Sequence, residues 1–348
     1  MSTPTTSSSE TAETNQTRGD RPSGLILLAV AVIVAVLLRP LFDGLLQNPA
    51  LQTWSTIFVS ITIQALPFLA LGVIVSGAIA AFVPPAALMR LMPRNPMLGV
   101  PVAGVAGLAL PGCECGSVPI AGRLASRGAS PAAAFAFMLA APAINPVVLA
   151  ATAVAFPGRL DIVAARFVAS LAAAIIVGWI WAKFGDNSLV RDAKGYDESA
   201  TPLSMFVQVA SHDFVHAGGW LVIGAMAAAT LQVAVPRSIL DVLAGNEVIA
   251  ILAMAVLAVV LAICSEADAF VAVGLTQFSL TSRLVFLVVG PAVDVKLIAL
   301  QAGVFGRRFT ARFAPLTFVV AVICAVVVGL IAAALTGDLG WRQGLVVL

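Results

Sequence analysis

Long apolar segments recur along almost the whole chain, and they constrain its fold more than any other feature. Of the 348 residues, 60% are hydrophobic and only 10% are charged, whereas a soluble domain carries about 25% charged residues. Several segments reach the roughly 20 apolar residues that a spanning helix needs. Because a backbone in lipid must satisfy its own hydrogen bonds, the sequence predicts an all-α polytopic membrane protein.

The apolar pattern divides the chain into six parts. These are a disordered cytoplasmic tail at 1–23, a first transmembrane span at 24–48, a first repeat at 49–184, a polar cytoplasmic linker at 185–202, a second repeat at 203–336 and a C-terminal tail at 337–348. The tail is polar and has too few apolar residues to fold. Seven spans are expected, at about 24–42, 51–83, 130–156, 160–183, 204–235, 283–305 and 310–336.

Two short stretches break apolar runs with residues that lipid tolerates poorly. They read Leu110-Pro-Gly-Cys-Glu-Cys-Gly-Ser-Val-Pro119 and Leu261-Ala-Ile-Cys-Ser-Glu-Ala-Asp-Ala-Phe270. Non-helical backbone at membrane depth must be buried in protein or line a cavity. Polar residues spaced at i, i+2 and i+4 suit extended backbone better than a helix. The sequence therefore predicts two broken or re-entrant helical hairpins that meet near the membrane midplane.

The two breaks belong to an internal repeat. Landmarks follow one order in both halves: Gly72 with Gly224, Cys113 with Cys264, Ser117 with Asp268, and Pro142-Ala-Ile-Asn145 with Pro291-Ala-Val-Asp294. The positive-inside rule favours re-entrant breaks, which place twelve Lys and Arg residues inside against five outside, over full crossings, which give nine against eight. Each half then crosses three times, which predicts inverted repeats with the N-terminus in the cytoplasm and the chain in the inner (plasma) membrane.

Cysteines in the breaks indicate a soft-ligand site. Sulfur selects thiophilic species such as As(III), Cu(I), Zn(II) or Cd(II). A lone cysteine in a membrane segment is more often an apolar filler, which is our interpretation of Cys324. The predicted substrate-binding residues are Cys113, Glu114, Cys115, Ser117, Asn145, Cys264, Glu266 and Asp268, and the metal candidates among them are Cys113, Cys115 and Cys264.

Charged residues in the second half are candidates for proton or ion coupling. Glu266, Asp268, Asp294 and Lys296 each lie in an apolar region, where a charge costs at least about 2.5 kcal/mol at the bilayer centre. A carboxyl group removed from water binds its proton more tightly, so such a cluster could relay protons. The alternative is a structural ion pair, in which Lys296 neutralises Asp294, Glu266 or Asp268.

A histidine pair offers a second metal candidate. His212 and His216 are four residues apart and share one helical face, a spacing that can hold a metal ion. Two histidines without a third strong ligand are also found as interfacial residues, so both interpretations stay open.

Several function classes are excluded or disfavoured by the composition. The net charge of +2 is too small and dispersed for a nucleic-acid partner. The chain has no P-loop or Gly-rich nucleotide motif, so we expect no enzyme activity and no cofactor. The expected partners are membrane lipid and a small-molecule or ionic substrate, and a homo-oligomer is left open.

With these residues in place, the sequence resembles the predicted permease family that includes the ArsP organoarsenical efflux permeases and the YraQ-like proteins. The resemblance covers 50–336 and rests on Cys113-Glu-Cys-Gly-Ser-Val-Pro119 and Ala140-Ala-Pro-Ala-Ile-Asn-Pro146. It implies an inner-membrane permease, with Cys113 and Cys115 as substrate ligands and Asn145 nearby. Some members export trivalent methylated arsenicals, and others are linked to copper or zinc. Glu114 departs from the small polar residue often found between the cysteines, which favours a cation over a neutral arsenical.

The combined hypothesis is a secondary transporter that exports a thiophilic species by alternating access. Trivalent methylated arsenic and soft metal ions are the candidate substrates. The alternatives are a membrane-embedded thiol redox or assembly factor, and an uncoupled channel.

Overall fold

The computed structural model describes residues 49–82, 95–109, 114–186, 201–234 and 246–341. In this part of the chain the regular structure is helical, with no strand. All contacts discussed below lie within Thr53–Leu348, which forms one compact unit. The expected tail at 1–23, the first span at 24–48 and most of the linker at 185–202 lie outside the described residues, so these predictions stay open.

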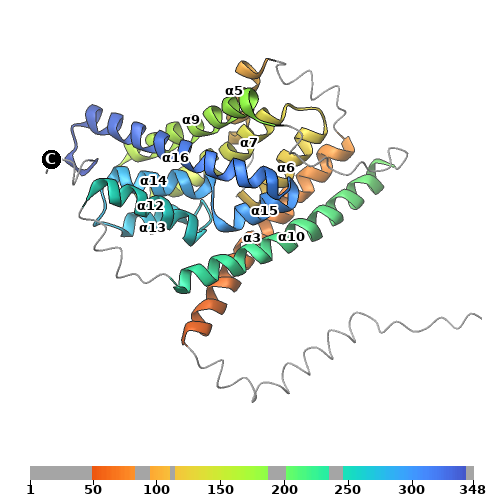
Figure 1. The fold of residues 1–348 in the computed structure, drawn as a ribbon, viewed down its shortest axis with the longest axis horizontal. Coiled ribbons are helices and arrows are strands. Elements are labelled where there is room, and N and C mark those ends of the chain that lie inside the picture. Colours follow the sequence, from red (N-terminus) through yellow and green to blue (C-terminus); the bar gives the residue numbers. More distant parts are fainter. Residues whose placement is uncertain (1–48, 83–94, 110–113, 187–200, 235–245, 342–348) are drawn as a thin grey trace, which may run out of the picture. The chain divides into compact units, whose positions relative to one another are not determined.

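The helices of the two halves follow the same order (Figure 1). In the first half they are α3 Pro49–Phe82, α5 Pro96–Ala106 with the 3₁₀ turn η1 Gly107–Ala109, α6 Glu114–Ser126, α7 Pro131–Ile144, α8 Pro146–Ala155 and α9 Leu160–Phe184. In the second half they are α10 Pro202–Ala234, α12 Glu247–Leu261, α13 Asp268–Gly274, α14 Leu280–Ala292, α15 Val295–Val304, α16 Arg307–Thr336 and the 3₁₀ turn η3 Leu339–Trp341.

Six helical segments of the described chain are long and apolar enough to cross a membrane. They are α3, α7 with α8, α9, α10, α14 with α15, and α16, and they correspond to the second to seventh predicted spans. Helices α5 and α12 are apolar but shorter, as expected for interrupted segments. The sixth span begins at Leu280, three residues before its predicted start, because Ser279 caps it.

Side-chain caps explain where the shorter helices begin. The side chains of Asn95, Ser130 and Asn145 accept hydrogen bonds from the first-turn amides of α5, α7 and α8. Asn246, Ser279 and Asp294 do the same for α12, α14 and α15 in the second half. Such caps satisfy backbone N–H groups that have no partner within the helix. The caps therefore repeat between the halves along with the helices.

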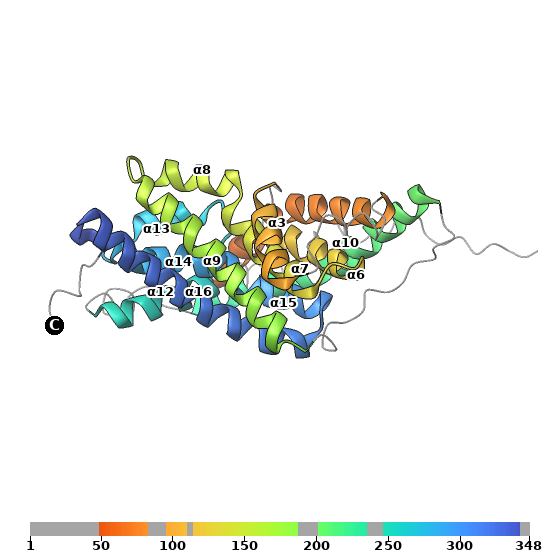
Figure 2. The ribbon, with the colours of Figure 1, turned by 90° about the horizontal axis from the view of Figure 1, so that it is seen from above.

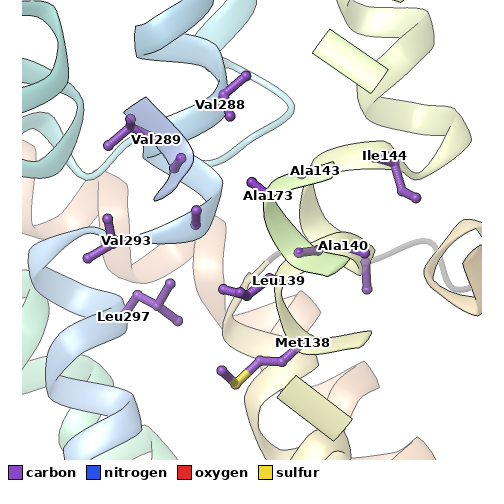
Figure 3. Close-up of a cluster of buried hydrophobic side chains, with 14 of the residues drawn as sticks. Met138, Leu139, Ala140, Ala143, Ile144, Ala173, Val288, Val289, Val293 and Leu297 are labelled. Carbon is purple, nitrogen blue, oxygen red and sulfur yellow. The ribbon is translucent and has the colours of Figure 1, made fainter. Parts of the chain in front are cut away.

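Helices α7 and α14 form the centre of the bundle. Helix α7 packs against α5 and α9, and α14 packs against α12 and α16. Every residue from Ala132 to Ile144 is buried. Leu139 of α7 and Val289 of α14 belong to a cluster that joins the two halves (Figure 3). The outer helices instead expose large apolar side chains such as Ile63 and Leu335, as expected for a surface that hydrocarbon covers.

Helices α3 and α10 run antiparallel to each other (Figure 1). Near one end Trp54 Nε1 donates a hydrogen bond to Thr230 Oγ1 at 3.0 Å. Near the other end Ser76 Oγ donates to Asp213 Oδ2 at 3.2 Å. Figure 2 shows α8 on the other side of the bundle from the end of α12. Both long helices also contribute to one pocket with the residues that follow α12.

Candidate functional site

The second break is fully described and begins at an unusual residue. Helix α12 ends at Leu261, and Ala262 follows with φ 47°, the one non-glycine residue of the described chain in the left-handed region. This conformation costs an L-residue roughly 1–2 kcal/mol. Helix α13 starts again at Asp268. The backbone is therefore non-helical from Ala262 to Ala267, as predicted.

The first break is described only from Glu114 onward. Cys113 lies outside the described residues, so its predicted role stays open. Glu114, Cys115 and Ser117 are buried in the first turn of α6, and the extended backbone expected for them was wrong. Gly116 does not interrupt helix α6. It allows α6 to approach α3 closely, because a Cβ at this position would lie 2.9 Å from Phe68 O in α3.

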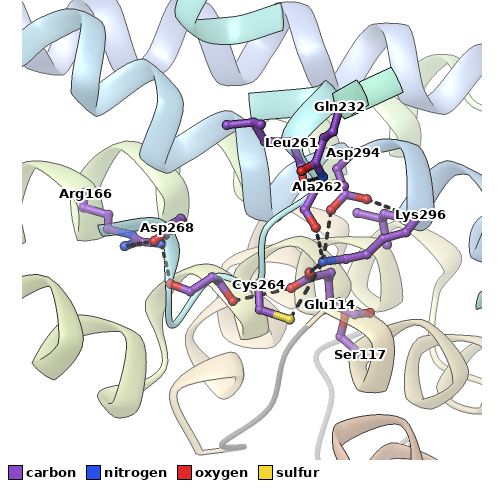
Figure 4. A network of polar contacts seen from close by, with 12 residues as sticks. Glu114, Ser117, Arg166, Gln232, Leu261, Ala262, Cys264, Asp268, Asp294 and Lys296 are labelled. Atoms are coloured by element: carbon purple, nitrogen blue, oxygen red, sulfur yellow. Dashed lines mark hydrogen bonds and ion pairs between the residues drawn. The ribbon is translucent and has the colours of Figure 1, made fainter. Parts of the chain in front are cut away.

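Lys296 forms the centre of a cluster that joins the two breaks (Figure 4). Its Nζ lies 2.5 Å from Glu114 Oε1 and 3.4 Å from Asp294 Oδ2. It also donates to Ala262 O at 2.8 Å and lies 3.8 Å from Cys264 Sγ. The Lys296 and Glu114 side chains are each 1% exposed. We call these five residues the Lys296 centre; it brings Glu114 of the first break to Cys264 of the second.

Arg166 of α9 forms a second buried ion pair, with Asp268. Arg166 Nη1 donates to Asp268 Oδ1 at 2.9 Å and Nη2 donates to Oδ2 at 2.7 Å, a bidentate geometry. Thr152 Oγ1 accepts a further bond from Nη1, and Ser265 O accepts one from Nη2. Ser265 Oγ in turn donates to Glu114 Oε2 at 3.4 Å. We call Arg166, Asp268 and Thr152 the Arg166 centre; Ser265 connects it to the Lys296 centre.

The predicted site residues therefore have different outcomes. Lys296 does pair with Asp294, one of the expected arrangements, whereas Asp268 is paired with Arg166. Glu266 Oε2 is buried without a hydrogen-bond partner among the described residues. Asn145, like Asp294, caps a helix, and its Nδ2 also donates to Ala141 O at 3.0 Å. A substrate role for Asn145 stays a prediction.

The two predicted histidines lie on exposed positions of α10. The two rings stack with centroids 5.9 Å apart. His212 Nδ1 lies 3.5 Å from Asp213 Oδ1, and His216 Nε2 lies 3.1 Å from Gly303 O. Across the described residues no group of three His, Cys, Asp or Glu side chains is placed to hold a metal ion. The metal hypothesis for this pair is left without structural support.

A pocket opens beside the Lys296 centre. Its volume is about 270 Å³, and it is lined by α3, by the end of α10 and by the second break. Cys264 and Lys296 form part of its wall. Gln232 of α10, also in the wall, donates to Leu261 O at 2.6 Å. The Lys296 centre is therefore buried in the protein on one side and borders this pocket on the other.

Sequence reasoning missed two parts of this site. Arg166 was not among the predicted site residues, although the cost of a charge in the membrane already required a partner. The polar residues Thr56 and Ser60 of α3 were not considered, although their spacing of four with Gln64 could have marked a polar helix face.

A bundle of six candidate spanning helices around a buried polar site defines a multi-pass membrane protein, and comparison with known proteins makes it a transporter. Residues 50–330 match the family model ArsP_1, described as predicted permease. The chain is 39% identical over 287 residues to the UPF0718 protein YcgR of Bacillus subtilis (strain 168), covering 80% of this chain and 97% of that protein.

A second relative comes from Streptococcus mutans and bears the name "Putative two-component membrane permease complex subunit". It is 32% identical over 282 residues, covering 78% of this chain and 94% of that protein. No solved structure matches the chain. The chain belongs to the family of predicted permeases, as the resemblance in its motifs indicated, and this family points to a transporter rather than an enzyme.

Proposed function

We propose that the protein is a secondary transporter that exports a small thiophilic species through the Lys296 centre by alternating access. The observation that carries this proposal is the meeting of both breaks in one buried cluster. Glu114 and Ser265 come from different halves of the chain, and their side chains lie 3.4 Å apart. Non-helical backbone converging on charged groups at membrane depth is a recurrent design of secondary transporters.

Sulfur near the ammonium group supports a thiophilic substrate. Cys115 and Cys264 are 1% and 2% exposed, and Cys264 Sγ lies 3.8 Å from Lys296 Nζ. A neighbouring cation stabilises a thiolate, the form that binds As(III) and soft metals. Glu114 is compensated by Lys296, so its charge no longer favours a cation. Trivalent methylated arsenic is therefore our first candidate and a soft metal ion the second.

An excess of acidic groups supports coupling to protons. Four carboxyl groups, of Glu114, Glu266, Asp268 and Asp294, lie near the two cations of Arg166 and Lys296. Buried carboxylates without a cation are costly, so the surplus is relieved by protons or by a bound cation. Asp268 is occupied by Arg166. We therefore assign the mobile proton to Glu266 or to the pair of Glu114 and Asp294.

Antiparallel packing of α3 on α10 supports the inverted arrangement of the repeats. If each break returns to the side from which it enters, α3, α7 with α8, and α9 make three crossings, and α10 then starts in the opposite direction to α3. Their side-by-side antiparallel contacts fit this count. We propose the inner (plasma) membrane and a cytoplasmic N-terminus on the distribution of Lys and Arg.

The name of the Streptococcus mutans relative also suggests an assembly. Because that protein is named as a subunit of a permease complex, we include a second membrane subunit, or a second copy of this chain, as a proposed partner.

A growth panel with a matched cysteine pair tests the proposal. A strain lacking the gene is challenged with methylarsenite, arsenite, copper, zinc and cadmium, and is complemented with the intact chain, Cys115→Ser or Cys324→Ser. We expect the intact chain and Cys324→Ser to restore resistance and lower cellular accumulation of one species, and Cys115→Ser to restore neither. Unchanged growth and uptake for all five species would reject thiophilic export.

Two further readouts separate the alternatives. A thiol redox factor would trap a mixed disulfide with a partner when Cys115 or Cys264 is replaced singly. An uncoupled channel would carry the same flux in vesicles whether or not a proton gradient is imposed, whereas the proposed transporter loses net uphill flux when the gradient collapses.

A further inference from the structure

The pocket beside the Lys296 centre is lined by a polar stripe of α3. Its polar lining residues are Thr56, Ser60, Gln64, Gln232, Cys264 and Lys296. Thr56, Ser60 and Gln64 are spaced at i, i+4 and i+8, so they form one helix face. Lys296 is the charged residue of this lining, which contains no carboxylate.

The stripe lies on a helix that is a candidate membrane span. Ser60 and Gln64 are exposed within Pro49–Phe82. Hydrocarbon offers no hydrogen-bond partners to such groups, whereas a water-filled cavity does. The stripe together with the pocket therefore fits an aqueous path that ends at Cys264 and Lys296.

An equivalent stripe exists on α10. The alignment of Gly72 with Gly224 pairs Thr56, Ser60 and Gln64 with residues 152 positions later, which are Gln208, His212 and His216. These three residues again have helical spacing of four and are exposed on a candidate span. Both long helices thus carry a polar face at matching positions of the repeat.

The two long helices differ in the helix against which each one packs. Helix α10 is seated directly on α15: a Cβ on Gly224 would lie 2.6 Å from Lys296 Cα, and a Cβ on Gly303 would lie 2.1 Å from Trp220 Cδ1. His216 contacts Gly303 O. Contacts this close leave no passage between α10 and α15 at this level.

Helix α8 occupies the matching position of the first half, and two of its residues are exposed where α15 is covered. Counting 149 positions back from Lys296 and Gly303 gives Val147 and Val154, which are 49% and 67% exposed. The surface that α10 covers on α15 thus has an open counterpart on α8. Helix α3 is instead seated on α6, where a Cβ on Gly72 would lie 2.3 Å from Gly116 Cα.

The stripes also lie toward opposite ends of the antiparallel pair. Ser76 contacts Asp213, which sets one common level on α3 and α10. Ser60 is sixteen residues before Ser76, or about 24 Å along the helix at 1.5 Å per residue, whereas His212 adjoins Asp213. A path along each stripe would therefore start from a different side of the membrane.

We infer that the α3 stripe lines the open half of the substrate path to Cys264 and Lys296, and that the α10 stripe lines the opposite half, closed here by α10 on α15. The inference rests on the proposed function and adds the residues of the path. The hydroxyl and amide groups of the lining, with an ammonium group already compensated by Glu114 and Asp294, suit a small neutral hydrogen-bonding solute along the α3 half. The α8 surface around Val147 and Val154 is where α3 would close in the other state.

Sided labelling tests the two halves without any substrate. Ser60→Cys and His212→Cys are made in the full chain, and their reaction with a membrane-impermeant maleimide is read relative to the unsubstituted protein in right-side-out and inside-out vesicles. We expect each variant to react at least about tenfold faster in one vesicle orientation, since thiol reaction follows exposure, with opposite preferences for the two. Equal sidedness, or no labelling of Ser60→Cys above the parent, would overturn the inference.

Two tryptophan substitutions then test whether the substrate passes along the α3 stripe. Ser60→Trp fills the pocket, whereas Val59→Trp adds the same bulk at the adjacent position, which is 48% exposed and outside the pocket lining. We expect methylarsenite flux to fall at least about tenfold for Ser60→Trp and to stay within about twofold for Val59→Trp, with equal amounts of both proteins in the membrane. Equal flux in the two variants would contradict the path. If the labelling is sided but even the intact chain moves no methylarsenite, the substrate proposal fails and the path stands.

Discussion

The Arg166 centre and the Lys296 centre are both buried, yet they are built differently. Arg166 meets one carboxylate, Asp268, through two parallel hydrogen bonds of 2.7 and 2.9 Å. Lys296 meets two carboxylates, Glu114 and Asp294, at 2.5 and 3.4 Å. The guanidinium forms a fixed fork, whereas the ammonium is a point charge on a flexible chain. The first centre is closed and balanced, and the second holds more acid than base.

This difference suggests a division of roles. A balanced bidentate pair has no reason to change during transport, so we assign the Arg166 centre to holding α9 against the second break. The Lys296 centre has a surplus carboxylate, the Cys264 thiol 3.8 Å from Lys296 Nζ and an adjoining pocket. A group that must exchange partners during transport needs these properties. Four substitutions test the distinction, from the largest expected effect to the smallest.

The largest effect is expected from Arg166→Leu. The change leaves Asp268 buried without its cation, and removing one partner of a buried pair costs roughly 3–5 kcal/mol. The amount of folded protein after gel filtration in detergent, and its thermal midpoint, should both fall. The double variant Arg166→Leu with Asp268→Leu should recover most of that loss. A stable single variant that cannot transport would reverse the assigned roles.

Lys296→Met should act mainly on transport. Because Lys296 borders a pocket, water can reach the position that the ammonium group leaves, so the loss of stability should be smaller than for Arg166→Leu. We expect the flux of the substrate found in the growth panel to fall about a hundredfold. Lys296→Arg is the matched variant that keeps the charge, and we expect no rescue, because a planar guanidinium does not fit the buried position where the ammonium group lies 2.5 Å from Glu114 Oε1 and 2.8 Å from Ala262 O. Normal flux in Lys296→Met would remove this centre from the mechanism.

A smaller effect is expected where α10 is seated on α15. Gly224→Ala places a methyl group 2.6 Å from Lys296 Cα and should cost about 1–3 kcal/mol, as overpacking does. Gly219→Ala in the same helix meets nothing within 4 Å, so it should be neutral or slightly stabilising. Thermal midpoints of the two variants in detergent provide the comparison. Similar midpoints would mean that the close seating of α10 does not stabilise this state.

The smallest effect is expected from Cys324→Ala. This thiol is 7% exposed in α16, within the apolar core, and it contributes to neither centre. We expect less than about 1 kcal/mol in stability and unchanged flux, whereas Cys264→Ala should reduce flux. If both variants behave alike in the growth panel, sulfur beside Lys296 has no special role.

Hydropathy and the helix-breaking residues of the sequence predicted most of the fold. Spans two to seven follow from apolar length, and Asn145 and Asp294, which the repeat alignment paired, each cap a helix. Ser279, the cap that moves the start of α14, shows how one side chain shifts a boundary that hydropathy cannot place. The inverted relation of the repeats stays a proposal.

The pairing of the charges could not be predicted. Arg166 and Asp268 are 102 positions apart, and no local pattern indicates which of several acids an arginine will reach. Gly116 was read as a helix breaker, but its role depends on α3 lying against it. Both cases rest on tertiary contacts, which a single sequence does not encode in its local spacing.

Ala262 connects the charged site to the backbone at the end of α12. A glycine would adopt its left-handed backbone more easily, by roughly 1 kcal/mol, yet the chain has alanine there and a hydrogen bond from Lys296 to its carbonyl oxygen. The ammonium group of Lys296 therefore stabilises the strained backbone at the end of α12. In the proposed transport cycle, any step that moves Lys296 away would also remove this hydrogen bond from the end of α12.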